Sequence, residues 1–150
     1  MARDLALLIL RAAGLGLALA HGWGKVVMLA SGGGDGFVRA VSAMGFPMPG
    51  VFAWAAALAE FGGGLAVALG LATRPAAGLA AFTMAVAAFG RHHAHDRLLA
   101  LVGLGQATPE QIKEWGNPEL ALVYLVILLA LALLGGGRFS LDAGLGRKRR

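Results

Sequence analysis

Cysteine is absent from this chain of 150 residues, which excludes disulfides, thiol redox relays, iron–sulfur clusters and cysteine zinc sites. Charge is also scarce, since only 14% of the residues are charged, against roughly a quarter in ordinary soluble domains. Hydrophobic residues make up 58% of the chain, more than a soluble core of this length can hide from water. Lipid accepts such apolar surface, so the composition predicts one compact membrane domain.

The net charge of +5 is concentrated at one end of the chain. Much of it comes from the C-terminal stretch "GRKRR", Gly146 to Arg150, which follows the last apolar run. Beside a membrane helix, such a cluster fixes the orientation or contacts anionic lipid. No basic surface interleaved with aromatic residues accompanies it, so we expect a lipid bilayer and no nucleic acid as the partner.

Four apolar runs predict an all-α, integral membrane four-helix bundle that forms a single domain. Their ranges are about 5–30, 51–72, 76–93 and 119–134. A helix that crosses the hydrocarbon needs about 20 residues, so the last two runs are expected to extend into their flanks. The connection Thr73–Pro75 is so short that the second and third runs must be antiparallel neighbours.

Local signals mark the segments between these runs. Thr108, Pro109 and Gln111 form the capping-box pattern of a short helix before the fourth run. Asn117 is the expected N-cap of the fourth run. The segment 31–50 is rich in glycine and proline and is expected to be a loop.

The distribution of lysine and arginine predicts that both termini are cytoplasmic. The expected inner side holds Arg3, Arg74, Arg138 and the C-terminal cluster. The basic residues of the expected outer side are mixed with acidic ones; they are Arg39, Arg91, Arg97 and Lys113. The N-terminal run imitates a signal peptide, but Arg11 interrupts it, so we expect no cleavage. The predicted location is the bacterial inner membrane, as a multi-pass protein.

Ionisable residues inside an apolar run are costly in lipid, so they are expected to face the bundle interior and to have partners there. One such set recurs on the first run at intervals of three and four residues: Arg11, Gly14, Ala18, His21 and Lys25. This spacing places the whole set on one helix face. We therefore expect that face to point inward.

The second and third runs direct ionisable groups to the same depth. Glu60 lies among small residues that let another helix approach closely. At 1.5 Å per residue, Glu60 and His21 each lie about 13 Å from the outer helix end, with Lys25 one turn nearer the surface. The third run ends on the same side with Arg91 and three histidines. The sequence thus predicts a polar site in the outer half of the bundle.

Simpler roles stay open for the charged members of this set. Lys25 can extend to the outer headgroups, and Arg11 can extend to the inner ones or pair with Asp4. Asp142 is expected to cap a helix or to pair with Arg138.

The histidines also have alternative possible roles. His21 alone can be a hydrogen-bonded packing residue. His92 and His95 have the spacing of a metal site, and His21 could hold haem together with His92 or His93. We expect no metal, because adjacent histidines at a helix end are commonly interfacial.

Four stretches together resemble the DoxX family of small bacterial membrane proteins. They are "LRAAGLGLALAHGWGK", "AEFGGGLAVALGLATRPAA", the histidines that end the third run, and "LLGGGRFSLD". The resemblance covers nearly the whole chain and implies a four-helix membrane protein. Some relatives are described as subunits of thiosulfate:quinone oxidoreductases, and others are linked to quinone or oxidative-stress responses.

The first hypothesis that follows is a quinone-linked redox subunit. Glu60 and His21 would act at the two quinone oxygens as the catalytic pair. The expected quinone-binding residues are Lys25, Trp23, Trp54, Arg91, His92 and His93. No nicotinamide or flavin motif is present, so a redox partner protein or a directly bound donor would supply the electrons.

The second hypothesis is a non-enzymatic membrane module that binds a partner subunit or carries a hydrophobic small molecule. In that case Glu60, Lys25 and Arg91 would form a structural ion-pair network. Transport would require a homo-oligomer or a further bundle. Whether the chain is an enzyme on its own stays open.

Overall fold

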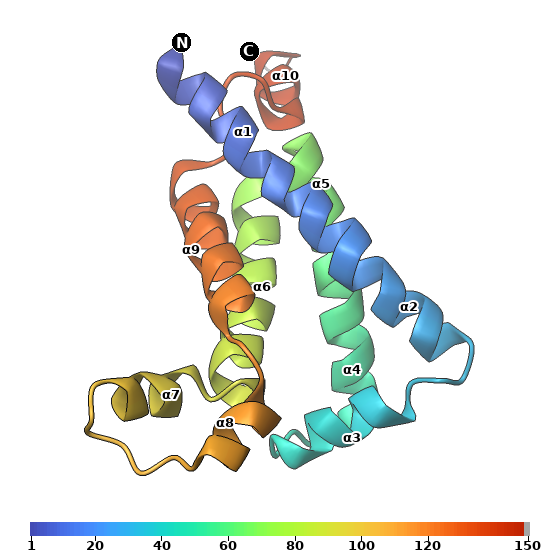
Figure 1. The fold of residues 1–150 in the computed structure, drawn as a ribbon. Helices are drawn as coiled ribbons and strands as arrows, with labels where there is room; N and C mark the ends of the chain where they lie inside the picture. Colours follow the sequence, from blue (N-terminus) through green and yellow to red (C-terminus); the bar gives the residue numbers. More distant parts are fainter. Residues whose placement is uncertain (149–150) are drawn as a thin grey trace.

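The computed structural model describes residues 1–148, which are helical with no strand among them (Figure 1). Arg149 and Arg150 of the predicted basic cluster lie outside the described residues. Two long helices are each formed by three segments, in which η denotes a π-helical segment. They are α1 (Ala2–Gly16), η1 (Leu17–Gly22) and α2 (Trp23–Ala30), and then α4 (Pro49–Leu58), η2 (Ala59–Gly63) and α5 (Gly64–Leu69).

Two further long helices complete the frame of the molecule. One consists of α6 (Thr73–Ala85) and η3 (Val86–Arg91), and the other is α9 (Glu119–Leu134). The shorter helices are α3 (Asp35–Ala43), α7 (Ala94–Leu101), α8 (Pro109–Trp115) and α10 (Leu141–Lys148). The segment expected to be a loop at 31–50 therefore contains a helix, α3.

Two helices of the described chain are long and apolar enough to cross a membrane, Ala2–Ala30 and Pro49–Leu69. A third candidate arises if α8 and α9, which are bent by 50° at a short break, count as one span. The all-helical architecture and the apolar helices therefore agree with the predicted membrane class.

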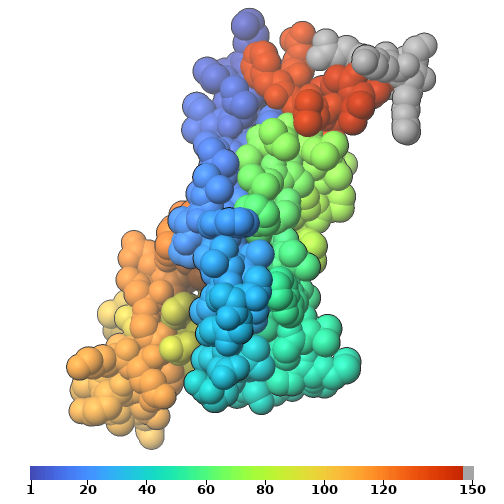
Figure 2. All heavy atoms as spheres, turned by 90° about the vertical axis from the view of Figure 1, so that its right-hand side faces the viewer, coloured from blue at the N-terminus to red at the C-terminus, as the bar shows by residue number. Residues whose placement is uncertain are grey.

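The first two long helices cross with their backbones in contact. Figure 2 shows the two segments adjoining on the surface of the molecule. A Cβ atom added to Gly14 would lie 2.6 Å from the carbonyl oxygen of Gly64. Only glycine permits this approach, as expected for small residues at helix crossings in membranes. The third long helix packs along α9. The hydrophobic core shared by the four long helices contains Leu17, Val67, Ala77, Ala80, Leu128 and Leu131.

Arg11 is the most deeply buried cation of the described chain, with 3% of its surface exposed. Its guanidinium donates hydrogen bonds to four backbone carbonyl oxygens, those of Val67, Ala68, Gly136 and Phe139, at 2.7 to 3.2 Å. It neither extends to the headgroups nor pairs with Asp4, because α5 and the segment after α9 surround it with carbonyl groups. Asp4 instead accepts a hydrogen bond from the backbone N–H of Arg138.

Of the predicted capping residues, Thr108, Gln111 and Asp142 cap helices, whereas Asn117 lies one residue before the N-cap of α9, which is Pro118. Thr108 and Gln111 form both hydrogen bonds of a capping box at α8. Asn117 accepts a hydrogen bond from the backbone N–H of Glu119 at 2.9 Å. Asp142 caps the first turn of α6 rather than pairing with Arg138, because the chain after α9 folds back against the α5–α6 turn.

Candidate functional site

Each of the three π-helical segments found within residues 1–148 carries one of the ionisable residues predicted for the site. His21 lies in η1, Glu60 in η2 and Arg91 in η3. Short π-helical segments inside α-helices are frequent at functional sites. A Cβ atom added to Gly22 would lie 2.4 Å from the backbone nitrogen of Phe61, so η1 and η2 touch at the backbone. This contact brings the polar face of the first helix against Glu60.

Lys25 and Glu60 form an ion pair that joins α2 to η2. The Lys25 Nζ atom lies 2.5 Å from the Glu60 Oε1 atom. The Glu60 side chain is 2% exposed and that of Lys25 is 28% exposed. The ammonium also lies over the Phe37 ring of α3, 5.2 Å from its centroid. Lys25 therefore points to the interior, where its charge has two partners, and not towards the headgroups.

The second carboxylate oxygen of Glu60 is in a different position. The Oε2 atom is buried and has no hydrogen-bond partner among the described residues. A buried acceptor without a donor costs about 1–3 kcal/mol, and more when it is charged. This atom is the one buried side-chain oxygen or nitrogen of the described chain that is left in that state.

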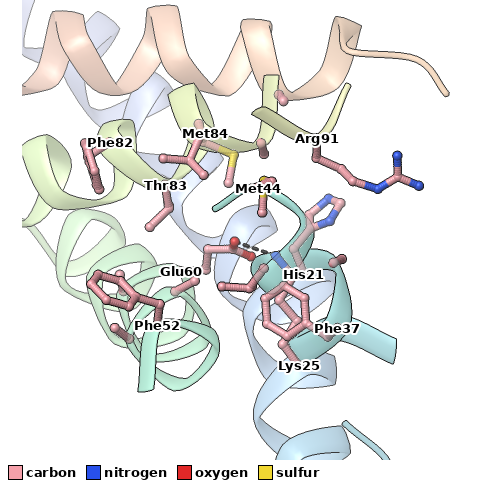
Figure 3. A pocket seen from close by; sticks show the side chains of 18 of the residues that line it. His21, Lys25, Phe37, Met44, Phe52, Glu60, Phe82, Thr83, Met84 and Arg91 are labelled. Atoms are coloured by element: carbon pink, nitrogen blue, oxygen red, sulfur yellow. Dashed lines mark hydrogen bonds and ion pairs between the residues drawn. The ribbon is translucent and has the colours of Figure 1, made fainter. Parts of the chain in front are cut away.

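The ion pair lies at the wall of a cavity of about 520 Å³. That volume falls in the range of sites for small organic ligands. Figure 3 shows Glu60 among the labelled side chains of the lining, with its contact to Lys25 drawn as a dashed line. The aromatic residues of the lining are Phe37, Phe46, Phe52, Phe82 and Tyr124. The cavity thus combines a wide apolar interior with a few polar groups.

One wall of this cavity also forms part of the outer surface of the long helices. Leu79 and Phe82 of α6 line the cavity, yet they are 54% and 61% exposed. Ala55 of α4 lines it as well and is also exposed. These residues are apolar and lie on the exposed surface of α4 and α6. The cavity is therefore bounded on this flank by side chains that also face outward.

The predicted site residues fall into two groups. Those that line the cavity are His21, Lys25, Glu60, Arg91 and His92. Those outside its lining are Trp23, Trp54 and His93. Trp23 is exposed and packs on Phe61 with ring centroids 5.3 Å apart, and His93 stacks on Trp115 at 4.7 Å. The aromatic wall expected from tryptophans is instead built by phenylalanines and Tyr124.

Sequence reasoning missed the contribution of α3 to the cavity. Phe37, Ala40, Val41 and Met44 all line it. The glycine-rich composition around them concealed the helix. The spacing of Phe37, Val41 and Met44 at four and three residues is helical, and it is the signal that could have revealed one apolar face.

The histidines at the end of the third long helix have protein partners. The Nδ1 atom of His92 lies 2.6 Å from the carbonyl oxygen of Trp115, and that of His93 lies 3.1 Å from an Asp96 oxygen. The described residues contain no group of three histidine, cysteine, aspartate or glutamate side chains that could hold a metal ion. The ring centroids of His21 and Tyr124 lie 5.8 Å apart, with the two ring planes at 81° to each other.

Fold and site together define a small helical membrane protein with a partly buried ion pair beside an apolar cavity. The chain belongs to the DoxX family, whose model matches residues 6–93. A curated relative, "Inner membrane protein YphA" of Escherichia coli (strain K12), is 34% identical over 142 residues, which is 94% of this chain and 91% of that protein. No solved structure gives a significant match. The chain is accordingly a bacterial inner-membrane protein embedded in the lipid bilayer.

Proposed function

We propose that the cavity binds a lipid-soluble quinone and that the chain is a quinone-linked redox subunit of the inner membrane. The observation that carries this proposal is the cavity of about 520 Å³ with aromatic walls and the Lys25–Glu60 pair at its side. A quinone has two apolar ring faces and two carbonyl oxygens that accept hydrogen bonds. The phenylalanines suit the faces, and Lys25, His21 and Arg91 can donate to the oxygens.

The exposed flank of the cavity supports a ligand that comes from the bilayer. A molecule dissolved in lipid would enter between α4 and α6, past Ala55 and Phe82. A polar ligand from water would gain nothing from such a route. This flank therefore favours a hydrophobic ligand with a polar ring, which is the chemistry of a quinone.

Reduction of a quinone consumes two electrons and two protons and converts both carbonyl groups to hydroxyls. In this proposal Glu60 and Lys25 hold a proton between them next to one oxygen, and His21 faces the other. The sequence has no cysteine and no nicotinamide or flavin motif, so in this proposal the electrons come from a partner protein or a bound donor. The redox step is thus assigned to a complex, and the binding step to this chain.

Blocking the cavity tests the binding step. Ala56→Phe adds a ring at the cavity wall, and Ala12→Phe adds the same ring on an exposed position of α1. Purified protein in lipid nanodiscs is titrated with ubiquinone-1 and compared with empty nanodiscs. We expect saturable binding by the wild type and Ala12→Phe, and affinity at least about tenfold lower, or 1.4 kcal/mol, in Ala56→Phe. Uptake by all three proteins equal to that of empty nanodiscs would refute the proposal.

A non-enzymatic role is the second candidate. The Lys25–Glu60 pair also joins two long helices, which a structural network in a partner-binding or carrier module would require. The two functions differ in one measurement: the rate of quinone reduction in native membranes that contain the wild type or Glu60→Gln at equal amounts. A loss of rate supports the redox subunit. An unchanged rate together with saturable quinone binding supports a carrier.

We propose further that all four long helices cross the membrane, with both termini cytoplasmic. The N-terminus, the α5–α6 turn and α10 lie at one end of the molecule, and α3, α7 and α8 lie at the other (Figure 1). The first end carries Arg3, Arg74 and Arg138, with few acidic residues nearby. An excess of basic residues marks the cytoplasmic side.

A further inference from the structure

We infer that the cavity discriminates between the two redox states of its ligand and binds the hydroxyl-bearing quinol more tightly than the quinone, through the unpaired Oε2 atom of Glu60. This inference rests on the proposed function, since it concerns the ligand of the same cavity. The inference goes beyond the proposed function because it assigns Glu60 a role in the selection of quinol over quinone. The relevant comparison is between the hydrogen bonds that each redox state can make.

Several donors around the cavity already have acceptors. Lys25 donates to the Oε1 atom of Glu60. Arg91 donates to the carbonyl oxygen of Glu114, and the Nδ1 atom of His92 faces the carbonyl oxygen of Trp115. The further N–H groups of the Lys25 ammonium and the His21 imidazole can donate to a ligand, and they serve a quinone carbonyl and a quinol oxygen alike. These donors therefore do not discriminate between the two redox states.

The acceptor at Glu60 is in the opposite situation. Its Oε2 atom is buried and has no donor among the described residues. A quinol hydroxyl supplies a donor, whereas a quinone has acceptors only and leaves the oxygen unpaired. A hydrogen bond to a charged group is worth more than one between neutral groups. The balance of donors and acceptors therefore favours the reduced ligand.

The geometry allows this contact with a small movement. Glu60 lines the cavity, and Figure 3 shows its carboxylate extending from η2 towards the middle of the labelled side chains. The terminal torsion of glutamate is broad, so a rotation about it turns an oxygen towards a ligand without a new rotamer of the rest of the chain. Lys25 can follow either oxygen because its ammonium has three donors.

Preferential binding of the quinol has a redox consequence. A site that holds the reduced form more tightly raises the midpoint potential of the bound couple above that of the free couple. A tenfold preference corresponds to about 30 mV for two electrons. The bound quinone would therefore accept electrons more readily than quinone free in the membrane. The quinol would also dissociate from the cavity more slowly than the quinone.

The test compares three ligands with the same ring: ubiquinone-1, ubiquinol-1 kept reduced under argon, and the dimethyl ether of ubiquinol-1, which has no hydroxyl. Each is titrated into nanodiscs that contain the wild type, Glu60→Gln or Glu110→Gln, the last a control on an exposed carboxyl of α8. We expect the wild type and Glu110→Gln to bind the quinol at least about tenfold more tightly than the quinone and the ether. Glu60→Gln should lose the preference, because an amide also offers a donor to the quinone.

Two results would overturn the inference and leave the proposed function intact. One is saturable binding of both redox states with equal affinity, or tighter binding of the quinone, by the wild type. The other is a preference that persists in folded Glu60→Gln. The ether comparison uses wild-type protein alone, so the test stands even if that variant does not fold. Absence of saturable binding by any ligand would refute the proposed function and this inference together.

Discussion

At the residue scale, Asp142 connects the C-terminal segment to the start of α6. Its carboxylate accepts hydrogen bonds from the backbone N–H groups of Ala72 and Thr73 and from the Thr73 hydroxyl, at 2.7 to 2.8 Å. Partial burial by itself raises the pKa of Asp142. The hydrogen bonds from Thr73 and Ala72 and the charge of Arg11 outweigh it, so the pKa lies below the ordinary value. The charged form is therefore the one that the fold favours.

Asp142→Asn should lower stability in a pH-dependent way. Because the folded-state pKa is lowered, the contribution is fully present above the ordinary aspartate pKa of about 4 and is lost as the pH falls through the folded-state value. We expect a loss of about 1 kcal/mol near neutral pH, as for a helix cap, and a smaller one in acid. Thermal unfolding in detergent from pH 7 to pH 3 measures it. Glu114→Gln, at an exposed carboxyl, is the control, and a difference independent of pH would contradict the assignment.

The partners of such residues were only partly predictable from the sequence. The spacing of Arg11, His21 and Lys25 indicated an inward face, and Arg11 is indeed buried. Its acceptors are backbone carbonyls that lie 56 to 128 residues away in the chain. Backbone groups carry no residue-specific signal, so the sequence suggested the carboxylate of Asp4 instead. The Lys25–Glu60 pair was easier to foresee, because both members are charged side chains at similar depth.

At the element scale, the crossing of η1 and η2 depends on one glycine. A Cβ atom on Gly22 would lie 2.4 Å from the nitrogen and 2.6 Å from the Cα atom of Phe61. Both are backbone atoms, so a rotamer change cannot relieve the overlap. Gly24 lies two residues further along, and nothing lies within 4 Å of the position its Cβ would take. Gly22 and Gly24 therefore serve as test and control positions for the same substitution.

Gly22→Ala should force the first two long helices apart. We expect a loss of stability of about 1–3 kcal/mol, as for overpacking, together with weaker quinone binding because Lys25 is carried away from Glu60. Gly24→Ala should be neutral or gain up to about 1 kcal/mol from its better helix propensity. Unfolding in detergent and titration with ubiquinone-1 measure both effects. Equal stability of the two variants would show that the crossing is not as close as described.

The elements themselves were predicted unevenly. Each apolar run coincides with a long helix, and the capping box at Thr108 marks the start of α8. Helix α3 was missed because glycine and proline dominate its flanks, although Phe37 and Val41 have helical spacing. The π-helical segments left no sequence signal that could be recognised. Their extra residue per turn changes which side chains face inward only locally, and hydropathy does not resolve that change.

At the scale of the whole molecule, the close contacts between the long helices lie at one end and the cavity lies at the other. The long helices meet near Arg11 and Gly14, where carbonyl hydrogen bonds and a glycine contact hold them together. They diverge towards the end that carries α3 and α8 (Figure 1). The cavity lies in the space so created and is closed in part by α3. This divergence depends on crossing angles, which the sequence did not specify, so the polar site was predicted but its apolar volume was not.

The proposed topology can be tested directly because the chain has no cysteine of its own. Single cysteines at three exposed positions, Ala2→Cys, Ser42→Cys and Gly144→Cys, place a label near the N-terminus, on α3 and on α10. A maleimide that does not cross membranes is applied to intact spheroplasts and, as a control, to permeabilised ones. Since basic residues are retained in the cytoplasm, only Ser42→Cys should react before permeabilisation. Reaction of Ala2→Cys and Gly144→Cys instead would invert the orientation, and reaction of just one of these two would show an odd number of crossings and refute the four-helix topology.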